Sequence, residues 1–429
     1  MKVLYLSTYE REGGAARAAH RLYTELKAQG VDMQMLTVHK TSRDPDVIPL
    51  FKAADPAKQS LWGVINQTLS HLLIFLDRAP RQIYRQRTLF AWSVGWLPTR
   101  IPQRIAPLKP DIIHLHWVGE GFVPIRAIRS FSDPVVWTFH DMWAFTGGCH
   151  STLDCARYEQ TCGQCPHLGS NRSHDLSRWT WQHKQKLWRD IHLTIITPSR
   201  WMGDCARSSS LLRNADIRVI PNGINLNQYR AIDKHVARQL LGLPLDKKII
   251  LFGAINSTSS PIKGFNHLQP ALQQMAARTG SDRFELAIFG APKPQNEPDF
   301  GFKAHYLDHI HDEQTIVALY SACDVFVAPF LQDNLSNMVI ESLACSLPCV
   351  AFASGGMPDM IDHQTNGYLA KPFEIDDLAA GITWVLSDEQ RWQTLSAHAR
   401  QTAEMKFDLS ANAQRYKNLY SEILDRKPT

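Results

Sequence analysis

The stretch DVFVAPFLQDNLSNMVIESLACS, residues 324–346, contains a strand, a loop and a helix in sequence. Its first five residues form a short apolar and β-branched run, which is typical of a buried strand in a parallel sheet. A polar loop follows and leads into a helical pattern at 337–346, for which Ser336 or Asn337 is a suitable N-cap. Such a unit predicts an α/β fold, in which helices connect parallel strands.

Similar units recur in two series along the chain. Apolar runs that predict strands lie at Val3–Leu6, Met33–Val38, Ile112–His116, Val135–Phe139, Leu193–Thr197, Ile217–Ile220, Ile249–Phe252, Phe284–Phe289, Asp324–Ala328 and Cys349–Phe352. The turn-rich Pro221-Asn222-Gly223 separates the two series. We therefore expect two doubly wound, Rossmann-like domains that face each other across a cleft.

The expected domain boundaries follow from this division. Residues 1–224 form the first domain and include a cysteine-rich insert at 148–170, and residues 225–408 form the second. Residues 409–429 form a C-terminal helix that we expect to pack back on the first domain.

Composition narrows the class of protein. The chain has 429 residues, of which 44% are hydrophobic and 20% charged, and this balance is that of a folded protein. The formal net charge of +5 is too small to indicate nucleic acid as a partner. No apolar run reaches the roughly 18 residues of a membrane-spanning helix, and Val3–Leu6 is too short for a signal peptide. We expect a cytoplasmic protein.

Two carboxylates flank the predicted helix start in the opening stretch. Asp333 precedes it and Glu341 lies about one turn inside it, while the backbone N–H groups at 335–338 suit a phosphate. Lys263 opens another helix after the strand that ends at Gly253, at the edge of a parallel sheet where such folds bind ligands. An alternative interpretation of the two acids is an ordinary helix-terminal charge and a surface glutamate.

Together these features resemble a known family. The chain is similar over nearly its whole length to family-4 retaining glycosyltransferases of GT-B architecture, of the type that builds bacterial surface polysaccharides. The resemblance rests on Gly13-Gly14-Ala15, Thr138-Phe139-His140-Asp141, Pro198-Ser199, Ile220-Pro221-Asn222-Gly223-Ile224, Lys263-Gly264, Asp333, Asn337, Glu341, Pro348 and Gly355-Gly356.

The resemblance implies a role for each matching residue. Lys263 balances the donor diphosphate, Glu341 bonds the ribose, and Asp333 bonds the donor sugar. His140 lies beside the reacting carbon, so the catalytic set is His140, Lys263 and Asp333. The implied donor-binding residues are Gly13, Gly14, Lys263, Asp333, Asn334, Leu335, Asn337 and Glu341.

This sequence departs from the family pattern in two places. The first acid is usually glutamate and here is Asp333, and no arginine follows Gly253, where the family has a second cation on the diphosphate. Arg200 or Lys293 is a candidate replacement. No Asp-x-Asp motif lies at a predicted strand end, so we expect metal-independent transfer, with Lys263 and helix N–H groups stabilising the leaving group.

The resemblance implies transfer of a sugar from a nucleotide diphosphate donor to a glycan or lipid-linked acceptor, with retention of configuration. The alternatives are a nucleotide-sugar epimerase or a phosphorylase of the same fold, and a non-catalytic glycan-binding protein. A dehydrogenase is disfavoured, because no Gly-x-Gly-x-x-Gly follows the first predicted strand.

The interval from Arg78 to Pro110 contains seven basic residues and no acidic residue, with aromatic and aliphatic side chains among them. One interpretation is a surface that rests on the anionic headgroups of the inner membrane face, which would make the protein peripheral. The other is an ordinary pair of surface helices.

Four of the eight cysteines, Cys149, Cys155, Cys162 and Cys165, lie within 17 residues. Cys-x2-Cys is the spacing of a zinc knuckle, and four thiolates form a closed structural site. We expect a structural zinc ion there, which would brace the loop that carries His140. Disulfides, unligated thiols and an iron–sulfur cluster are the alternatives. The expected cofactor list has no catalytic member.

Overall fold

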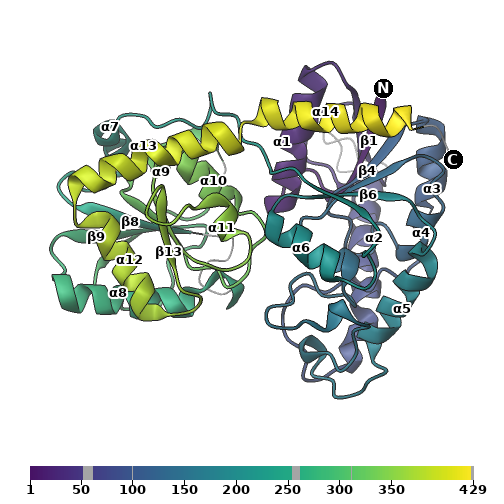
Figure 1. The fold of residues 1–429 in the computed structure, drawn as a ribbon, viewed down its shortest axis with the longest axis horizontal. Coiled ribbons are helices and arrows are strands. Elements are labelled where there is room, and N and C mark those ends of the chain that lie inside the picture. The colour runs from purple at the N-terminus through teal and green to yellow at the C-terminus, as the bar shows by residue number, and fades with distance from the viewer. Residues whose placement is uncertain (52–60, 99, 254–260, 311, 427–429) are drawn as a thin grey trace. The chain divides into compact units, whose positions relative to one another are not determined.

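The computed structural model describes residues 1–51, 61–98, 100–253, 261–310 and 312–426. The chain divides into two compact units (Figure 1). Unit 1 comprises Met1–Ile220 with Ala413–Thr429, and unit 2 comprises Pro221–Asn412. Each unit is described by itself below. No helix within the described ranges combines the length and apolar character needed to cross a bilayer.

Unit 1 is built on a seven-stranded parallel sheet in the order β3-β2-β1-β4-β5-β6-β7. Its strands are β1 Lys2–Tyr9, β2 Asp32–His39, β3 Val47–Pro49, β4 Ile112–Leu115, β5 Val135–Thr138, β6 Leu193–Thr197 and β7 Asp216–Val219. Its helices before the second unit are α1 Gly14–Ala28, α2 Leu61–Arg78, α3 Ile101–Ile105, α4 Ile125–Arg129, α5 Leu176–Trp188 and α6 Arg200–Ser208.

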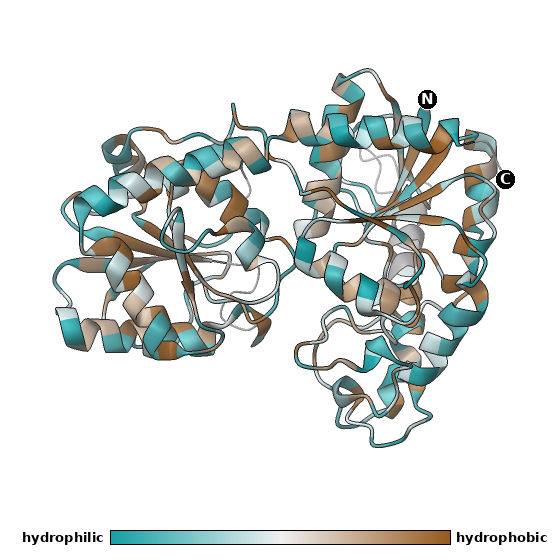
Figure 2. Cartoon of the chain, in the orientation of Figure 1, coloured by the Kyte–Doolittle hydropathy of each residue, from teal (hydrophilic) through white to brown (hydrophobic). Residues whose placement is uncertain are grey.

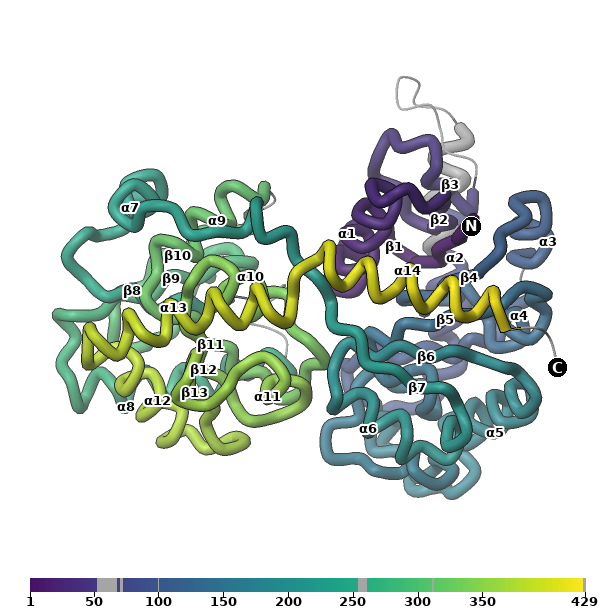
Figure 3. The backbone as a smooth tube through the Cα atoms, turned by 45° about the horizontal axis from the view of Figure 1, so that its top comes forward, coloured from purple at the N-terminus to yellow at the C-terminus, as the bar shows by residue number. Residues whose placement is uncertain are grey.

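The C-terminal helix α14, Leu409–Asp425, ends the chain on unit 1. It lies beside β1 and β4 (Figure 3), where the Tyr420 hydroxyl is 2.6 Å from His114 Nδ1 and 3.1 Å from the Tyr5 hydroxyl. At its end, Glu422 pairs with Arg218 of β7 at 2.6 Å. The expectation that this helix packs on the first domain is confirmed.

Unit 2 contains a six-stranded parallel sheet in the order β10-β9-β8-β11-β12-β13. Its strands are β8 Lys248–Gly253, β9 Phe284–Phe289, β10 Lys303–Tyr306, β11 Val325–Ala328, β12 Cys349–Phe352 and β13 Gly367–Ala370. Its helices are α7 Lys234–Leu241, α8 Phe265–Thr279, α9 Glu313–Ala322, α10 Asn337–Ala344, α11 Met357–Met360, α12 Ile375–Leu386 and α13 Glu389–Lys406. The prediction of two doubly wound α/β units is confirmed.

Burial explains why the central strands form. Strands β4, β5, β11 and β12 are buried along their whole length, and Figure 2 shows the strands of both sheets as mainly hydrophobic. Apolar helix faces cover both sides of each sheet, which is the layered arrangement that parallel strands require. The carboxyl ends of the strands in each sheet therefore meet at one edge, and the loops there carry most of the polar residues singled out above.

Candidate active site

Three loops meet at the carboxyl edge of the unit 2 sheet, after the neighbouring strands β8, β11 and β12. Backbone hydrogen bonds join them. Leu331 N donates to the Ile262 oxygen at 2.8 Å, and Gly356 N donates to the Asp333 oxygen at 2.9 Å. The Ser354 hydroxyl donates to the Phe330 oxygen at 2.9 Å. The loop after β11 is thus fixed from both sides before any ligand contacts it.

Lys263 and Asp333 lie together at this junction. Lys263 Nζ is 3.0 Å from Asp333 Oδ2 and 4.2 Å from the centre of the Phe330 ring. Both charged side chains are about a quarter exposed, at 24% and 23%. The ammonium group is therefore held at the sheet edge by a carboxylate and an aromatic face, and it still reaches solvent. Two loops that are 70 residues apart in sequence converge here.

Glycines allow this close approach. Gly264 has φ 70°, and a Cβ atom on it would lie 1.8 Å from the Pro329 oxygen. Gly355 has φ 56°, and its Cβ would lie 2.3 Å from the Asp333 oxygen. Both positions combine a left-handed backbone with contact to another loop, so only glycine satisfies them.

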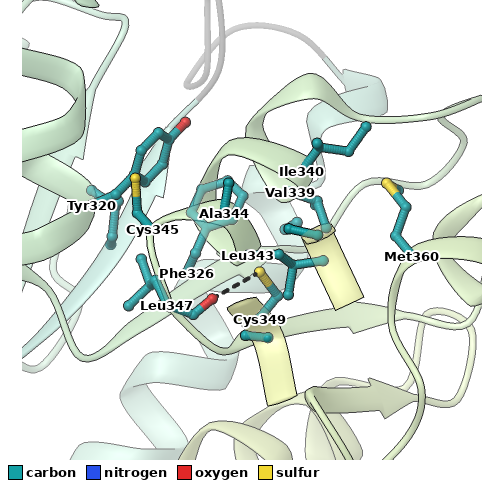
Figure 4. Packing of buried hydrophobic residues seen from close by; sticks show 14 of the residues in the cluster. Tyr320, Phe326, Val339, Ile340, Leu343, Ala344, Cys345, Leu347, Cys349 and Met360 are labelled. Carbon is teal, nitrogen blue, oxygen red and sulfur yellow. Dashed lines mark hydrogen bonds between the residues drawn. The ribbon is translucent and has the colours of Figure 1, made fainter. Parts of the chain in front are cut away.

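Helix α10 holds Glu341 beneath this junction. Glu341 is buried, and the Tyr320 hydroxyl donates to its Oε2 at 3.0 Å. Apolar residues of the same helix, among them Val339, Ile340 and Leu343, pack into the core and fix its axis (Figure 4). Tyr320 was not predicted as a site residue from the sequence. It belongs to α9, and its sequence context is that of an ordinary aromatic residue of the core.

The start of α10 is buried and polar. Ser336 is its N-cap, but its side chain makes no capping bond, and its buried Oγ has no hydrogen-bond partner within the described part of the chain. Asn334 and Leu335 precede it and are nearly buried, and Asn337 is the first helical residue. Asn334, Leu335, Asn337, Asp333 and Glu341 thus lie on one continuous loop and helix start.

The glycine loop of unit 1 follows β1. Gly13 is the N-cap of α1 with φ 85°, a conformation that L side chains rarely adopt, and Gly14 is the first helical residue. Next to it, Glu10 is buried and accepts hydrogen bonds from Thr41 N at 2.5 Å and Ser42 N at 2.8 Å. Gly13 and Gly14 therefore lie at the carboxyl edge of this sheet, as their position after the first strand predicts.

His140 also lies at the carboxyl edge of the unit 1 sheet. It follows β5, and its Nε2 is 3.0 Å from Nδ1 of His116, which follows β4. Burial lowers the pKa of His140 to about 4, and it lowers the pKa of His116 well below its usual value. Both rings are therefore uncharged at neutral pH. Sequence reasoning did not assign His116 to the site, although its position two residues after His114 at a strand end was a usable signal.

Asp141 is the centre of a second polar network. It accepts hydrogen bonds from Trp117 Nε1 at 2.5 Å, His150 Nδ1 at 2.6 Å and Trp143 N at 2.8 Å. Burial alone would raise its pKa, but His150 and these donors outweigh burial and lower it. The resulting carboxylate fixes the loop between His140 and His150.

The contacts of Lys293 and Arg200 do not show which residue supplies the second positive charge expected beside the donor diphosphate. Lys293 lies in the loop after β9 and pairs with Glu297 at 2.5 Å. Arg200 begins α6 of unit 1. Residues 254–260, where the family pattern places its arginine, lie outside the described residues.

The four cysteines of the insert line one cavity, together with Trp92 and His167. All four are free thiols. Throughout the ranges that the structure describes, no three His, Cys, Asp or Glu side chains are grouped so that they could hold a metal ion as they stand. The zinc ion therefore stays a prediction.

Comparison with known proteins identifies the family. The pattern of the "Glycosyltransferase Family 4" proteins matches residues 12–228, and that of the "Glycosyl transferases group 1" proteins matches residues 246–388. The chain belongs to glycosyltransferase family 4. Its expected membership, drawn from scattered short motifs, is confirmed.

Individual relatives agree with this assignment. The chain is 30% identical over 335 residues to a D-inositol 3-phosphate glycosyltransferase of Thermobispora bispora, which covers 75% of this chain and 72% of the relative. It is 24% identical over 274 residues to the putative colanic acid biosynthesis glycosyl transferase WcaC of Escherichia coli, covering 59% and 62%. The structure of Anabaena HepE in complex with UDP-glucose superposes with a TM-score of 0.62 at 18% identity, over 98% of this chain and 100% of that one.

This glycosyltransferase therefore has the GT-B fold. In unit 2 the structure pairs Lys263 with Asp333, and Asn334, Leu335, Asn337 and Glu341 follow Asp333 on the same loop and helix. In unit 1 it places Gly13, Gly14 and His140 at the sheet edge. The individual roles of these residues stay predictions.

Proposed function

We propose that this glycosyltransferase transfers a sugar, with retention and without a catalytic metal ion, from a nucleotide diphosphate donor to a glycan or lipid-linked acceptor. The observation that carries the proposal is the junction of Lys263, Asp333 and the α10 helix start at one sheet edge. A cation, the backbone N–H groups of a helix start and a buried carboxylate are the three partners that a diphosphate, its sugar and a ribose need.

The chemistry follows from where charge develops. As the bond between the anomeric carbon and the diphosphate breaks, negative charge accumulates on the departing oxygen. Lys263 and the N–H groups at the start of α10 would stabilise that charge in place, because they are fixed before the reaction. Glu341, oriented by Tyr320, would accept hydrogen bonds from the ribose hydroxyls, and Asp333 would accept them from the sugar.

His140 would serve as a neutral hydrogen-bonding group beside the sugar. Since burial lowers its pKa to about 4, its ring carries no charge that would oppose the oxocarbenium character of the transition state. His116, at 3.0 Å, would fix its orientation. The acceptor hydroxyl would then attack from the face that the diphosphate leaves, which retains the configuration of the anomeric carbon.

The donor can be tested directly. We expect one of UDP, GDP, ADP and dTDP to raise the melting temperature of the protein well above the others, and HepE, which binds UDP-glucose, favours UDP as the first choice. The matching nucleotide sugar should then be consumed only when an acceptor extract is present. Isomerisation of the donor without acceptor would support the epimerase instead, and dependence on inorganic phosphate would support the phosphorylase. Binding of a glycan with no response to any nucleotide would support the non-catalytic alternative.

We also propose that a lipid-linked acceptor is met at an anionic membrane surface. In the Arg78–Pro110 interval and the end of α2, the apolar side chains of Phe75, Ile83 and Leu89 are 63%, 81% and 96% exposed. Arg85 and Arg100 of the same interval are also exposed. Trp92 and Leu97, by contrast, are core residues, so they are removed from the expected lipid contact.

The membrane proposal has its own measurement. We expect the protein to co-sediment with vesicles that contain phosphatidylglycerol and to stay in solution with phosphatidylcholine alone. Phe75→Ser with Leu89→Ser should weaken binding at least about tenfold, since each buried apolar side chain contributes about 2 kcal/mol. Leu240→Ser, at a leucine of unit 2 that is 69% exposed, is the control. Equal binding by both variants would contradict the proposed surface.

A further inference from the structure

Two buried basic side chains outside the cysteine-rich insert, Arg81 and Lys184, form no ion pair with a carboxylate among the described residues. Lys184, fully buried on α5, donates its Nζ to the carbonyl oxygens of Trp143 and Thr146, the latter at 3.0 Å. Arg81, also buried, donates to the Thr88 oxygen, and its Nε has no partner among the described residues. A buried charge is costly unless an opposite charge balances it, so a nearby anion would stabilise both side chains in their charged form.

The nearest carboxylates are already engaged elsewhere. Asp77 accepts hydrogen bonds from Val94 N at 3.1 Å and Gly95 N at 2.7 Å. Asp141 accepts three hydrogen bonds from other groups, as described above. The cysteines face both side chains as well: Cys149 and Cys162 act electrostatically on Lys184 together with Asp141 and Asp77, and Cys149 and Cys165 act on Arg81.

The cysteines share a small cavity. All four line it, and its free volume of about 10 Å³ admits one water molecule or one metal ion and no larger ligand. A wider cavity of about 820 Å³ lies against Cys155 and Cys162 and gives a route for an ion to enter. Size and approach therefore suit a single ion.

The backbone around the Cys-x2-Cys pair is fixed in advance. Gly163 N donates to the Ser177 hydroxyl at 2.9 Å, and Cys165 N donates to Asp175 Oδ2 at 2.8 Å, so the start of α5 clamps the turn. Cys162 and Gln164 both have positive φ, 51° and 46°, and strain of this kind persists only where surrounding contacts impose it.

We propose that Cys149, Cys155, Cys162 and Cys165 bind one zinc ion as thiolates and that Lys184 and Arg81 balance the charge of this centre. Zinc with four thiolates carries two negative charges, which matches the two unpaired cations. The four sulfur atoms do not form a metal-holding group as they stand. Zinc binding therefore requires the sulfur atoms to move closer together, with release of the thiol protons to solvent.

Such a centre would brace the loop that carries His140. Cys149 directly precedes His150, whose Nδ1 is 2.6 Å from Asp141 Oδ2. Met142 N donates to the His150 oxygen at 3.0 Å, and Lys184 holds Trp143 and Thr146. The ion would thus fix residues 140–150 from one end and α5 from the other, a structural role and not a catalytic one.

The first test is metal content. Protein purified without added zinc should contain one equivalent per chain by elemental analysis, and thiol reagents should reach the four cysteines only after a chelator has removed the ion. Cys149→Ser and Cys165→Ser should each lose most of the zinc, while Cys205→Ser, outside both cavities, should keep it. Metal-free protein with reactive thiols, a mass lower by the hydrogens of two disulfides, or bound iron would each overturn the proposal.

In the second test, Lys184→Met is expected to have different effects depending on whether the four cysteines bind zinc or are neutral thiols. If the zinc thiolate centre exists, Lys184→Met removes its counter-charge, and zinc should be lost to a competing chelator at least about tenfold more readily. If the four cysteines are neutral thiols, Lys184→Met removes an unbalanced buried cation and should raise the melting temperature. Lys186→Met, exposed on the same helix, is the control for the substitution itself. A higher melting temperature with unchanged metal content contradicts the proposed charge balance.

Discussion

Lys263→Ala is expected to lower kcat about 100- to 1,000-fold, the usual cost of removing one fixed group that stabilises developing negative charge. Its Nζ is the cation held at the carboxyl edge of the unit 2 sheet, 3.0 Å from Asp333. The charge on the leaving diphosphate grows as the reaction proceeds, so the loss should be larger in kcat than in donor affinity. Steady-state kinetics with the donor found by the nucleotide screen measures both.

A second substitution, at Asp333, makes the Lys263 experiment more specific. In Lys263→Ala it is left without its cation and beside the diphosphate, so it should repel the nucleotide. Lys263→Ala with Asp333→Asn should therefore bind the nucleoside diphosphate more tightly than Lys263→Ala alone, without regaining kcat. Such non-additivity is expected of two residues in direct contact.

A lysine remote from the site provides the comparison. Lys303→Ala removes an exposed lysine at the amino end of β10, the opposite end of the strands from the Lys263 loop, and should leave kcat unchanged. If Lys263→Ala retains kcat within about fivefold of the parent, the ammonium does not stabilise the leaving group, and the metal-independent mechanism has to be abandoned.

The central strands could be predicted from the sequence, and three edge strands could not. Strands such as β11 and β12 are continuous apolar runs because helices cover both of their faces. The strands that sequence reasoning missed, β3, β10 and β13, each lie at a sheet edge. They contain residues such as Pro49, Lys303 and Gly367, which are tolerated where one side has no neighbouring strand.

The candidate site shows the same division between local pattern and long-range contact. The position of Asp333 before a helix start and of Lys263 after a strand follows from local sequence, so their shared sheet edge was predictable. The direct pairing of the two side chains depends on backbone contact between distant loops, which no local pattern encodes. Tyr320 was missed for this reason, because it acts through one long-range hydrogen bond to Glu341. The bond between His116 and His140 is also long-range, but the position of His116 at a strand end was visible in the sequence.

Gly264→Ala should disrupt the same junction through the backbone. Any residue other than glycine pays about 1–2 kcal/mol to adopt a left-handed conformation. At Gly264 the added Cβ would also lie 1.8 Å from the Pro329 oxygen, so the loop that carries Phe330 and Asp333 has to move. We expect unit 2 to lose at least about 3 kcal/mol, the range of severe backbone and packing defects.

Gly242→Ala separates the two causes. Gly242 is the C-cap of α7 in the same unit, with φ 64° against 70° at Gly264, but its added Cβ would meet no atom within 4 Å. It should therefore show the conformational cost alone. For a unit of this size a loss of 1 kcal/mol lowers the melting temperature by about 2–4 °C, so the two variants should differ clearly in calorimetry.

Nucleotide binding then tests whether the close contact between Gly264 and the Pro329 loop serves to position Lys263. If Gly264 serves to seat Lys263 against the loop after β11, Gly264→Ala should lose the stabilisation by nucleoside diphosphate, and Gly242→Ala should keep it in full. Equal melting temperatures for the two variants would mean that the Pro329 loop yields without cost. In that case the loop after β11 would not hold Lys263 in a fixed position, and the ammonium group would have to be positioned by the ligand itself.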